Sequence, residues 1–157
     1  MWKRKRKICG EFPDFGAIFM SNRTTFRDCL NSKLFGLPSS QSHFVKQVRA
    51  GMILFLFENE ERELHGVFQA TSDGQMNIMP KAYESSGKLF PAQVQCTRIW
   101  ECDPLGESEF RDAIEENYYE TKKFNFGLSQ HQVCFCYYAC FYSAFFRLQS
   151  SEIFGLS

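Results

Sequence analysis

Apolar stretches separated by turn residues predict strands in the first half of the chain. Residues 16–22, GAIFMSN, are a short apolar run that ends at a turn residue, which is typical of a strand. Residues 52–57, MILFLF, are apolar without interruption and predict a strand buried on both faces. A polar interval then leads to LHGVFQA, so residues 52–70 predict a hairpin. Gly66 in its second strand indicates a bulge or a close backbone approach, as in a curved sheet.

Between the strand at residues 16–22 and the strand at residues 52–57, the spacing of apolar residues changes to that of a helix. Phe26, Leu30 and Leu34 recur at helical spacing, and they predict a one-sided helix of about three turns. Thr25 with Asp28 matches a capping box at its start. This stretch therefore predicts a helix packed on the sheet through its apolar residues.

The stretch FGLP follows the predicted helix. Gly36 can adopt the left-handed conformation that closes a helix, and Pro38 cannot continue one. Both residues are explained as a helix stop. Phe35 and Leu37 have no local apolar partner, so we expect them to contact another apolar surface.

The second half predicts one further strand and two helices. Residues 91–100, PAQVQCTRIW, alternate between apolar and polar side chains and predict a half-exposed strand. Phe110 and Ile114 have helical spacing, and Ser129 with Gln132 forms a capping box at the start of a last helix.

Together these elements predict an α+β domain: a small mixed or antiparallel β-barrel or curved sheet flanked by N- and C-terminal helices. The chain has 157 residues and 44% apolar content, which suits one domain with a sizeable core, and its 18 Phe favour strands over a helical bundle. We expect the domain to cover residues 10–133. A basic disordered tail would precede it at residues 1–9, and an aromatic, Cys-rich tail would follow at residues 134–157.

That C-terminal tail contains no charged residue from Val133 to Phe146. As a helix this stretch would span about 21 Å, less than the roughly 30 Å of a bilayer core, so we expect no membrane span. Two interpretations of this tail stay open: a buried terminal segment and an exposed adhesive one.

Charge is unevenly distributed along the chain. The formal net charge is zero, yet residues 3–7, KRKRK, carry +5, so the rest of the chain carries −5. A mildly acidic domain has no long-range attraction for phosphate. The basic run is interpreted as a solvated tail, with nuclear import or polyanion binding as its alternative. The seven Cys and the lack of an apolar signal segment favour an intracellular chain, cytoplasmic, nuclear or both.

Catalytic and metal-binding patterns are not found in the sequence. His43, His65 and His131 lie in different predicted elements, and His65 is interpreted as a packing residue. The CFC stretch at Cys134 and Cys136 is too closely spaced for a zinc site and lacks a second ligand pair. We therefore expect a binding module, not an enzyme, with no cofactor and no metal.

Four stretches in order resemble the motif set of the plant DCD domain, named for development and cell death. They are FGLP, LFL, PAQV and EENYY, spread over roughly residues 10–133. The candidate binding residues on these motifs are Phe35, Gly36, Leu37, Pro38, Leu54, Phe55, Leu56, Pro91, Ala92, Gln93, Val94, Glu116, Asn117 and Tyr118.

The resemblance implies a non-enzymatic module of plant stress, hormone or programmed-cell-death signalling, made mostly of strands bounded by helices. Two departures stand out. Ile114 occupies the position before the two acidic residues where the family commonly has Pro. After Gln132 and Val133, the aromatic tail differs from the amphipathic Leu- and Lys-containing helix of the family.

The order of elements is also similar to that of the YTH and EVE domains of the PUA-like group, small barrels that bind modified bases in aromatic cages. A cage here could use Phe35, Tyr83 or Phe90. Basic residues for its rim would come from the set Lys46, Arg49, Lys81, Lys88 and Arg98.

Two functions follow from these resemblances. A protein-interaction module predicts that Phe35 or Leu37 is exposed in an apolar patch. The alternative, RNA or modified-base binding, predicts a concave aromatic site with basic residues at its rim and salt-sensitive binding. We favour protein partners, with RNA as the second hypothesis.

Overall fold

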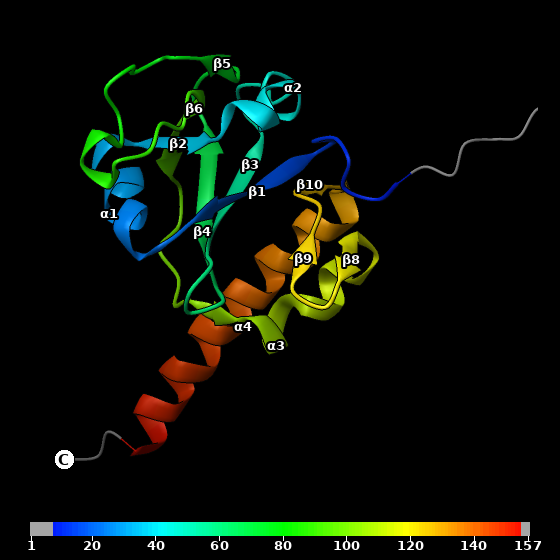
Figure 1. Cartoon of the computed structure of the whole chain (residues 1–157). Helices are drawn as coiled ribbons and strands as arrows, with labels where there is room; N and C mark the ends of the chain where they lie inside the picture. The colour runs from blue at the N-terminus through cyan, green and yellow to red at the C-terminus, as the bar shows by residue number, and fades with distance from the viewer. Residues whose placement is uncertain (1–7, 155–157) are drawn as a thin grey trace, which may run out of the picture.

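A mixed β-sheet that curls into a half-barrel forms the centre of the molecule (Figure 1). The computed structural model describes the backbone of residues 8–154 and the side chains of residues 8–142. The strands are ordered β10-β1-β3-β4-β6-β2, with β5 beside β6 and β7 beside β4. Their bounds are β1 (Gly16–Ser21), β2 (Leu34–Leu37), β3 (Ile53–Glu58), β4 (Glu63–Ala70), β5 (Gln75–Met76), β6 (Ala92–Arg98), β7 (Leu105–Gly106) and β10 (Gly127–Leu128).

Helices flank the half-barrel at both ends of the chain, and the predicted α+β class is confirmed. A two-stranded ribbon, β8 (Tyr118–Glu120) and β9 (Lys123–Phe124), lies outside the main sheet. The α-helices are α1 (Arg23–Ser32), α2 (Ser42–Val45), α3 (Glu107–Phe110) and α4 (Gln130–Phe154), and the 3-10 helices are η1 (Ser39–Gln41), η2 (Glu84–Ser86) and η3 (Arg111–Asn117).

The central strand is β3, as its unbroken apolar run predicts. It pairs in parallel with β1 and antiparallel with β4, which confirms the hairpin. The β3–β4 register shifts between Leu54 and Leu56, close to Gly66. A Cβ on Gly66 would lie 2.7 Å from the Phe55 ring, so this glycine permits a close approach between the strands.

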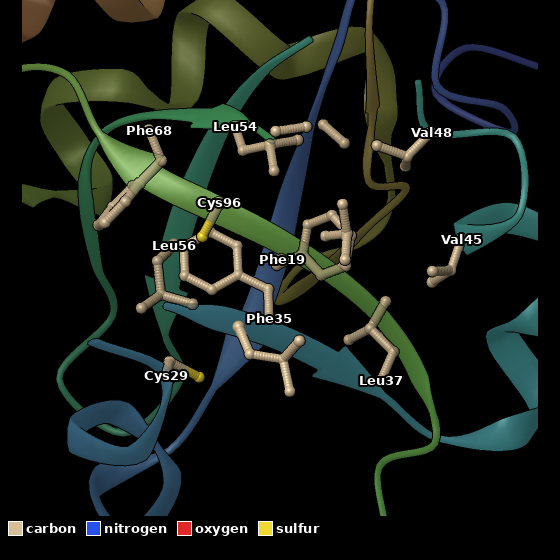
Figure 2. Close-up of a cluster of buried hydrophobic side chains, with 14 of the residues drawn as sticks. Phe19, Cys29, Phe35, Leu37, Val45, Val48, Leu54, Leu56, Phe68 and Cys96 are labelled. Atoms are coloured by element: carbon tan, nitrogen blue, oxygen red, sulfur yellow. The ribbon is translucent and has the colours of Figure 1, made fainter. Parts of the chain in front are cut away.

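The two faces of the curled sheet carry two separate cores. The inner one, here called the barrel core, lies in the concavity, where Phe19 of β1 and Phe35 of β2 come within 5.6 Å between ring centres (Figure 2). Its buried members are Ala17, Phe19, Cys29, Leu34, Phe35, Leu37, Phe44, Val45, Val48, Leu54, Leu56, Phe68, Ala70, Tyr83, Ala92, Val94 and Cys96.

The second core, here called the outer core, lies between the convex face of the sheet and the C-terminal third of the chain. Phe57 of β3 packs edge-on against Phe110 of α3 and Phe124 of β9, at 5.8 and 5.2 Å between ring centres. Its buried members are Ile18, Phe55, Phe57, Leu64, Val67, Leu105, Phe110, Ile114, Phe124, Leu128, Val133, Cys136 and Cys140.

The first helix begins and ends at residues other than those predicted. Asn22 is the N-cap and forms the capping box with Thr25, so the predicted box of Thr25 with Asp28 is wrong. At the other end Lys33, with φ 51°, adopts the left-handed conformation, and its N–H donates to the carbonyl of Cys29.

FGLP is therefore not a helix stop. Leu34 to Leu37 form strand β2, which pairs antiparallel with β6. The interpretation of Gly36 as the closing residue fails because Lys33 already ends the helix. Gly36 serves packing instead: a Cβ there would lie 2.9 Å from the Phe90 carbonyl oxygen and from the Tyr83 ring.

The C-terminal helix starts as the capping box predicts. The Ser129 N–H donates to Gln132 Oε1 at 3.0 Å, and the Gln132 N–H donates to Ser129 Oγ at 3.2 Å. α4 then continues through residue 133 without interruption, and Cys136 and Cys140 lie in the outer core. One face of the uncharged stretch is thus buried, while Phe135, Tyr138 and other aromatic residues on it are exposed.

The late helix around Phe110 and Ile114 is broken into two short pieces, α3 and η3, although both side chains are buried as predicted. None of the helices in the described part of the chain combines the length and apolar content that a bilayer span requires. The predicted basic tail lies outside the described residues except for Ile8 and Cys9.

Candidate functional site

Three of the four motifs meet inside the barrel core. FGLP and PAQV are paired strands, with Phe35 opposite Val94 and Leu37 opposite Ala92. From LFL, Leu54 and Leu56 join the same core, whereas Phe55 points to the outer core. These motifs define the interior of the half-barrel.

Burial contradicts the predicted apolar patch. Phe35 is fully buried and Leu37 is 2% exposed, so neither side chain presents a surface to a partner. Among the candidate residues of these three motifs, Pro38 is exposed and Pro91 partly exposed, at the same end of the paired strands. The reason is geometric: a strand that closes a curled sheet turns its large side chains inward.

The predicted aromatic cage is closed by packing. Tyr83 and Phe90 lie beside Gly36 and pack edge-on at 5.5 Å between ring centres, whereas the Phe35 ring packs on Phe19 and Phe68. Tyr83 is only 4% exposed, and its hydroxyl donates to the Leu34 carbonyl. Each of the three rings is thus packed against other aromatic side chains, and together they do not form an open cage.

Gln93 of the PAQV motif is buried and fixes the loop that carries Tyr83. Its amide group accepts from the Met79 N–H at 2.8 Å and donates to the carbonyls of Met79 and Phe90 at 3.1 and 3.0 Å. The half-exposed strand pattern predicts solvent exposure for Gln93, which is wrong, whereas Gln95 on the same face is exposed. A buried amide with these three bonds is a structural element of the loop.

The fourth motif lies on the other side of the sheet, at the N-terminus of α4. Asn117 is buried and donates to the carbonyls of Asn125 and Gly127 at 3.1 and 2.8 Å. Its Oδ1 accepts from Gln132 Nε2 at 2.8 Å. Asn117 thereby joins η3, the β9–β10 loop and α4, while Glu116 stays exposed and Tyr118 half-buried.

Beside Asn117 an open groove of about 1020 Å³ separates residues 8–14 from η3 and the start of α4. We call it the acidic groove, because the described residues that line it include six carboxylates and neither Lys nor Arg. The carboxylates are Glu11, Asp14, Glu109, Asp112, Glu115 and Glu116. Glu116 is the only candidate site residue of the sequence analysis that lines it.

Apolar side chains are also open to solvent along the acidic groove. Ile8 is 56%, Phe12 46% and Phe135 51% exposed. The wall made by residues 8–14 is held in place by backbone contacts, since the Gly127 N–H donates to the Gly10 carbonyl at 2.9 Å. A Cβ on Gly127 would lie 2.0 Å from the Phe12 carbonyl oxygen, so only glycine fits there. The groove thus combines negative charge with exposed apolar surface.

His65, the histidine of strand β4, serves packing. His65 stacks on Phe26 at 4.5 Å between ring centres and lies 3.6 Å from Glu63 Oε2. Burial, and to a lesser degree Arg98, lower the pKa of His65. Within residues 8–142 no three His, Cys, Asp or Glu side chains are grouped as metal ligands.

The fold is that of the YTH domains. The Mmi1 YTH domain in complex with RNA matches with a TM-score of 0.60 and 14% identity, over 88% of this chain and 86% of that one. The Pho92 YTH domain in complex with m6A matches with a TM-score of 0.55 and 14% identity, over 81% and 85%. At such identities the likeness concerns the fold alone.

The sequence comparisons assign the chain to a family, which is a more specific relationship than a shared fold. Residues 15–137 match the model of the development and cell death domain, and the chain belongs to that family. The B2 protein of Daucus carota is 37% identical over 118 residues, which is 73% of this chain and 56% of that protein.

Two further plant relatives carry the same domain within longer chains. The DCD domain-containing protein NRP-A of Glycine max is 37% identical over 118 residues, 73% of this chain and 32% of the relative. The DCD domain-containing protein NRP of Arabidopsis thaliana is 35% identical over 122 residues, 75% and 34%. The chain therefore spans between about a third and just over half the length of these relatives.

Proposed function

We propose that this DCD domain is a non-enzymatic protein-interaction module of plant stress, hormone or cell-death signalling, and that it binds basic, apolar segments of partner proteins in the acidic groove. The observation that carries the proposal is the lining of the groove: six carboxylates, with no Lys or Arg among its described residues, next to exposed Ile8, Phe12 and Phe135.

The groove chemistry selects a partner with Lys or Arg side chains spaced between apolar ones. Carboxylates that face one opening steer a cationic segment towards it, and the exposed apolar side chains supply area that is buried on contact. A nucleic acid phosphate would be repelled by the same carboxylates. The role in stress and cell-death signalling is supported by the family and by its plant relatives.

RNA binding is the second hypothesis, and the YTH fold favours it, since solved YTH domains are in complex with RNA. The predicted rim residues Lys46, Arg49, Lys81, Lys88 and Arg98 are all exposed. However, they belong to separate segments, and the Tyr83 ring that they would border is buried edge-on against Phe90, with its hydroxyl bonded to the Leu34 carbonyl. We therefore rank RNA below a protein partner.

Peptide binding distinguishes the two hypotheses. We expect a labelled short peptide of alternating lysine and leucine to bind the full chain in a fluorescence anisotropy titration, more weakly as salt increases. A matched peptide with glutamate in place of lysine should not bind. Tight binding of a labelled RNA, modified or unmodified, without binding of the basic peptide would overturn the proposal in favour of the RNA hypothesis.

A further inference from the structure

Thiols from two distant segments meet in the outer core. Cys102 lies in the loop after β6, and its thiol donates to the Gly66 carbonyl at 3.1 Å. The thiol of Cys140 on α4 is close enough to interact with the same sulfur, and Cys102 packs against the outer core to which Cys140 belongs. Cys140 is fully buried, whereas Cys102 is partly exposed.

Aromatic packing holds this loop on the helix. The Trp100 ring lies 5.4 Å from Tyr137 and 5.7 Å from Phe141 between ring centres. These two residues are one turn apart on α4 and lie on either side of Cys140 along the helix. The loop that carries Cys102 is thus anchored on the turn of α4 that carries Cys140.

We propose that Cys102 and Cys140 form an oxidation site for peroxides, in which Cys102 reacts first and Cys140 then closes a disulfide that ties the loop after β6 to α4. The inference is independent of the acidic groove, because it uses none of the groove's lining residues.

The chemistry of the two thiols differs as such a reaction requires. The Cys140 thiol can donate a hydrogen bond to an ionised Cys102. This hydrogen bond and the charge of Arg98 lower the pKa of Cys102, against the opposing effect of burial. The pKa of Cys140 is raised by the same hydrogen bond and by burial. Cys102 is therefore the attacking thiolate, and Cys140 stays protonated until it is needed.

The reaction balances with hydrogen peroxide as the oxidant. The Cys102 thiolate attacks one oxygen, the O–O bond breaks, and the departing hydroxide takes the proton that Cys102 had lost, giving a sulfenic acid and one water. The Cys140 sulfur then attacks the Cys102 sulfur and the S–O bond breaks. The second hydroxide takes the Cys140 proton, so two thiols and one peroxide give one disulfide and two waters.

A second thiol pair in the chain provides an internal control. Cys29 and Cys96 line a small hollow of about 110 Å³ beside Phe68. Burial raises the pKa of Cys29 to about 11 and that of Cys96 to about 12, so both stay protonated at neutral pH and react slowly. We expect peroxide to leave this pair reduced.

The test treats the full chain with a small excess of hydrogen peroxide and maps the products by mass spectrometry. Wild type and Cys134→Ser, which alters an exposed thiol on the same helix, should both yield a peptide linked through Cys102 and Cys140. In Cys140→Ser the sulfenic acid at Cys102 should be trapped by dimedone, and Cys102→Ser should give neither product.

Thermal unfolding provides a second readout. Closing a loop of this length should raise the melting temperature of the oxidised wild type by on the order of 10 °C relative to the reduced form. The shift should be absent in Cys102→Ser, a variant that changes the partly exposed residue of the pair. A disulfide formed instead by Cys29 and Cys96, or dimedone labelling of Cys134 while Cys102 stays reduced, would overturn the proposal.

Discussion

The two faces of the sheet differ in what their residues do. In the barrel core the family motifs FGLP, LFL and PAQV are packed against one another, and their large side chains are closed to solvent. On the opposite side, the residues around Asn117 and α4 hold open a groove with charged and apolar side chains at its surface. The comparison teaches that three of the four motifs specify the fold, whereas the fourth, through Glu116, borders the groove that we propose as the partner surface.

The largest expected effect comes from truncation within the barrel core. Phe35→Ala removes a fully buried ring that packs on Phe19 and Phe68, and should cost about 3–5 kcal/mol of unfolding free energy. Phe12→Ala, at the acidic groove, should change it by less than about 0.5 kcal/mol. Urea unfolding followed by circular dichroism measures both, and equal losses would contradict the division between the two faces.

Asn117 is expected to be the next most sensitive position. Asn117→Ala leaves two carbonyls and the Gln132 amide without their partner, which should cost about 3 kcal/mol. Asn117→Asp keeps the shape but removes both N–H donors, so a similar loss is expected. Asn31→Ala, on the exposed face of α1, is the control. Thermal melting checks this, and a melting temperature unchanged in Asn117→Ala would exclude its structural role.

A smaller effect is expected at Gly36. Gly36→Ala places a methyl group 2.9 Å from the Phe90 carbonyl oxygen and the Tyr83 ring, which should cost about 1–3 kcal/mol. Gly36→Val should cost more, since the loss grows with the size of the added group. If instead no atoms lay close to Gly36, both variants would be tolerated in an unfolding titration.

The smallest effect concerns pH. Burial, then Arg98, lower the pKa of His65, so the folded chain takes up its proton less readily than the unfolded chain does. The stability contributed by neutral His65 is therefore present above the unfolded pKa of about 6.5 and is lost as the pH falls below it. In His65→Gln the urea midpoint should depend less strongly on pH in this range. An unchanged slope in His65→Gln would refute the assignment.

Much of the fold follows from local pattern. Three features depend only on residues that are close together in the sequence, and all three are confirmed. They are the unbroken apolar run of β3, its hairpin with β4, and the capping box of Ser129 with Gln132. FGLP was misread because Gly and Pro after a helix usually mark its end. What overrides that rule is pairing with β6, a contact across a long stretch of sequence.

The candidate site depends still more on distant contacts. Whether Phe35 points outward or inward is decided by the closure of the sheet, which no local pattern shows. The sequence does carry one sign of the acidic groove, the carboxylates at Glu109, Asp112, Glu115 and Glu116. Their common opening depends on residues 8–14 being held by Gly127, so the groove could not be located before the fold was known.

A charge-reversal comparison tests the central claim most directly. Asp112→Lys with Glu115→Lys changes two exposed carboxylates of the acidic groove, and Glu84→Lys with Glu101→Lys changes two exposed carboxylates away from it. Both double variants have the same net charge and should retain wild-type stability. Binding of the lysine–leucine peptide is measured by anisotropy for both.

We expect the groove variant to bind the peptide at least about tenfold more weakly than wild type, which corresponds to about 1.4 kcal/mol, while the control variant stays close to wild type. Equal weakening in both variants would show that net charge alone attracts the peptide, and would contradict a binding site in the acidic groove.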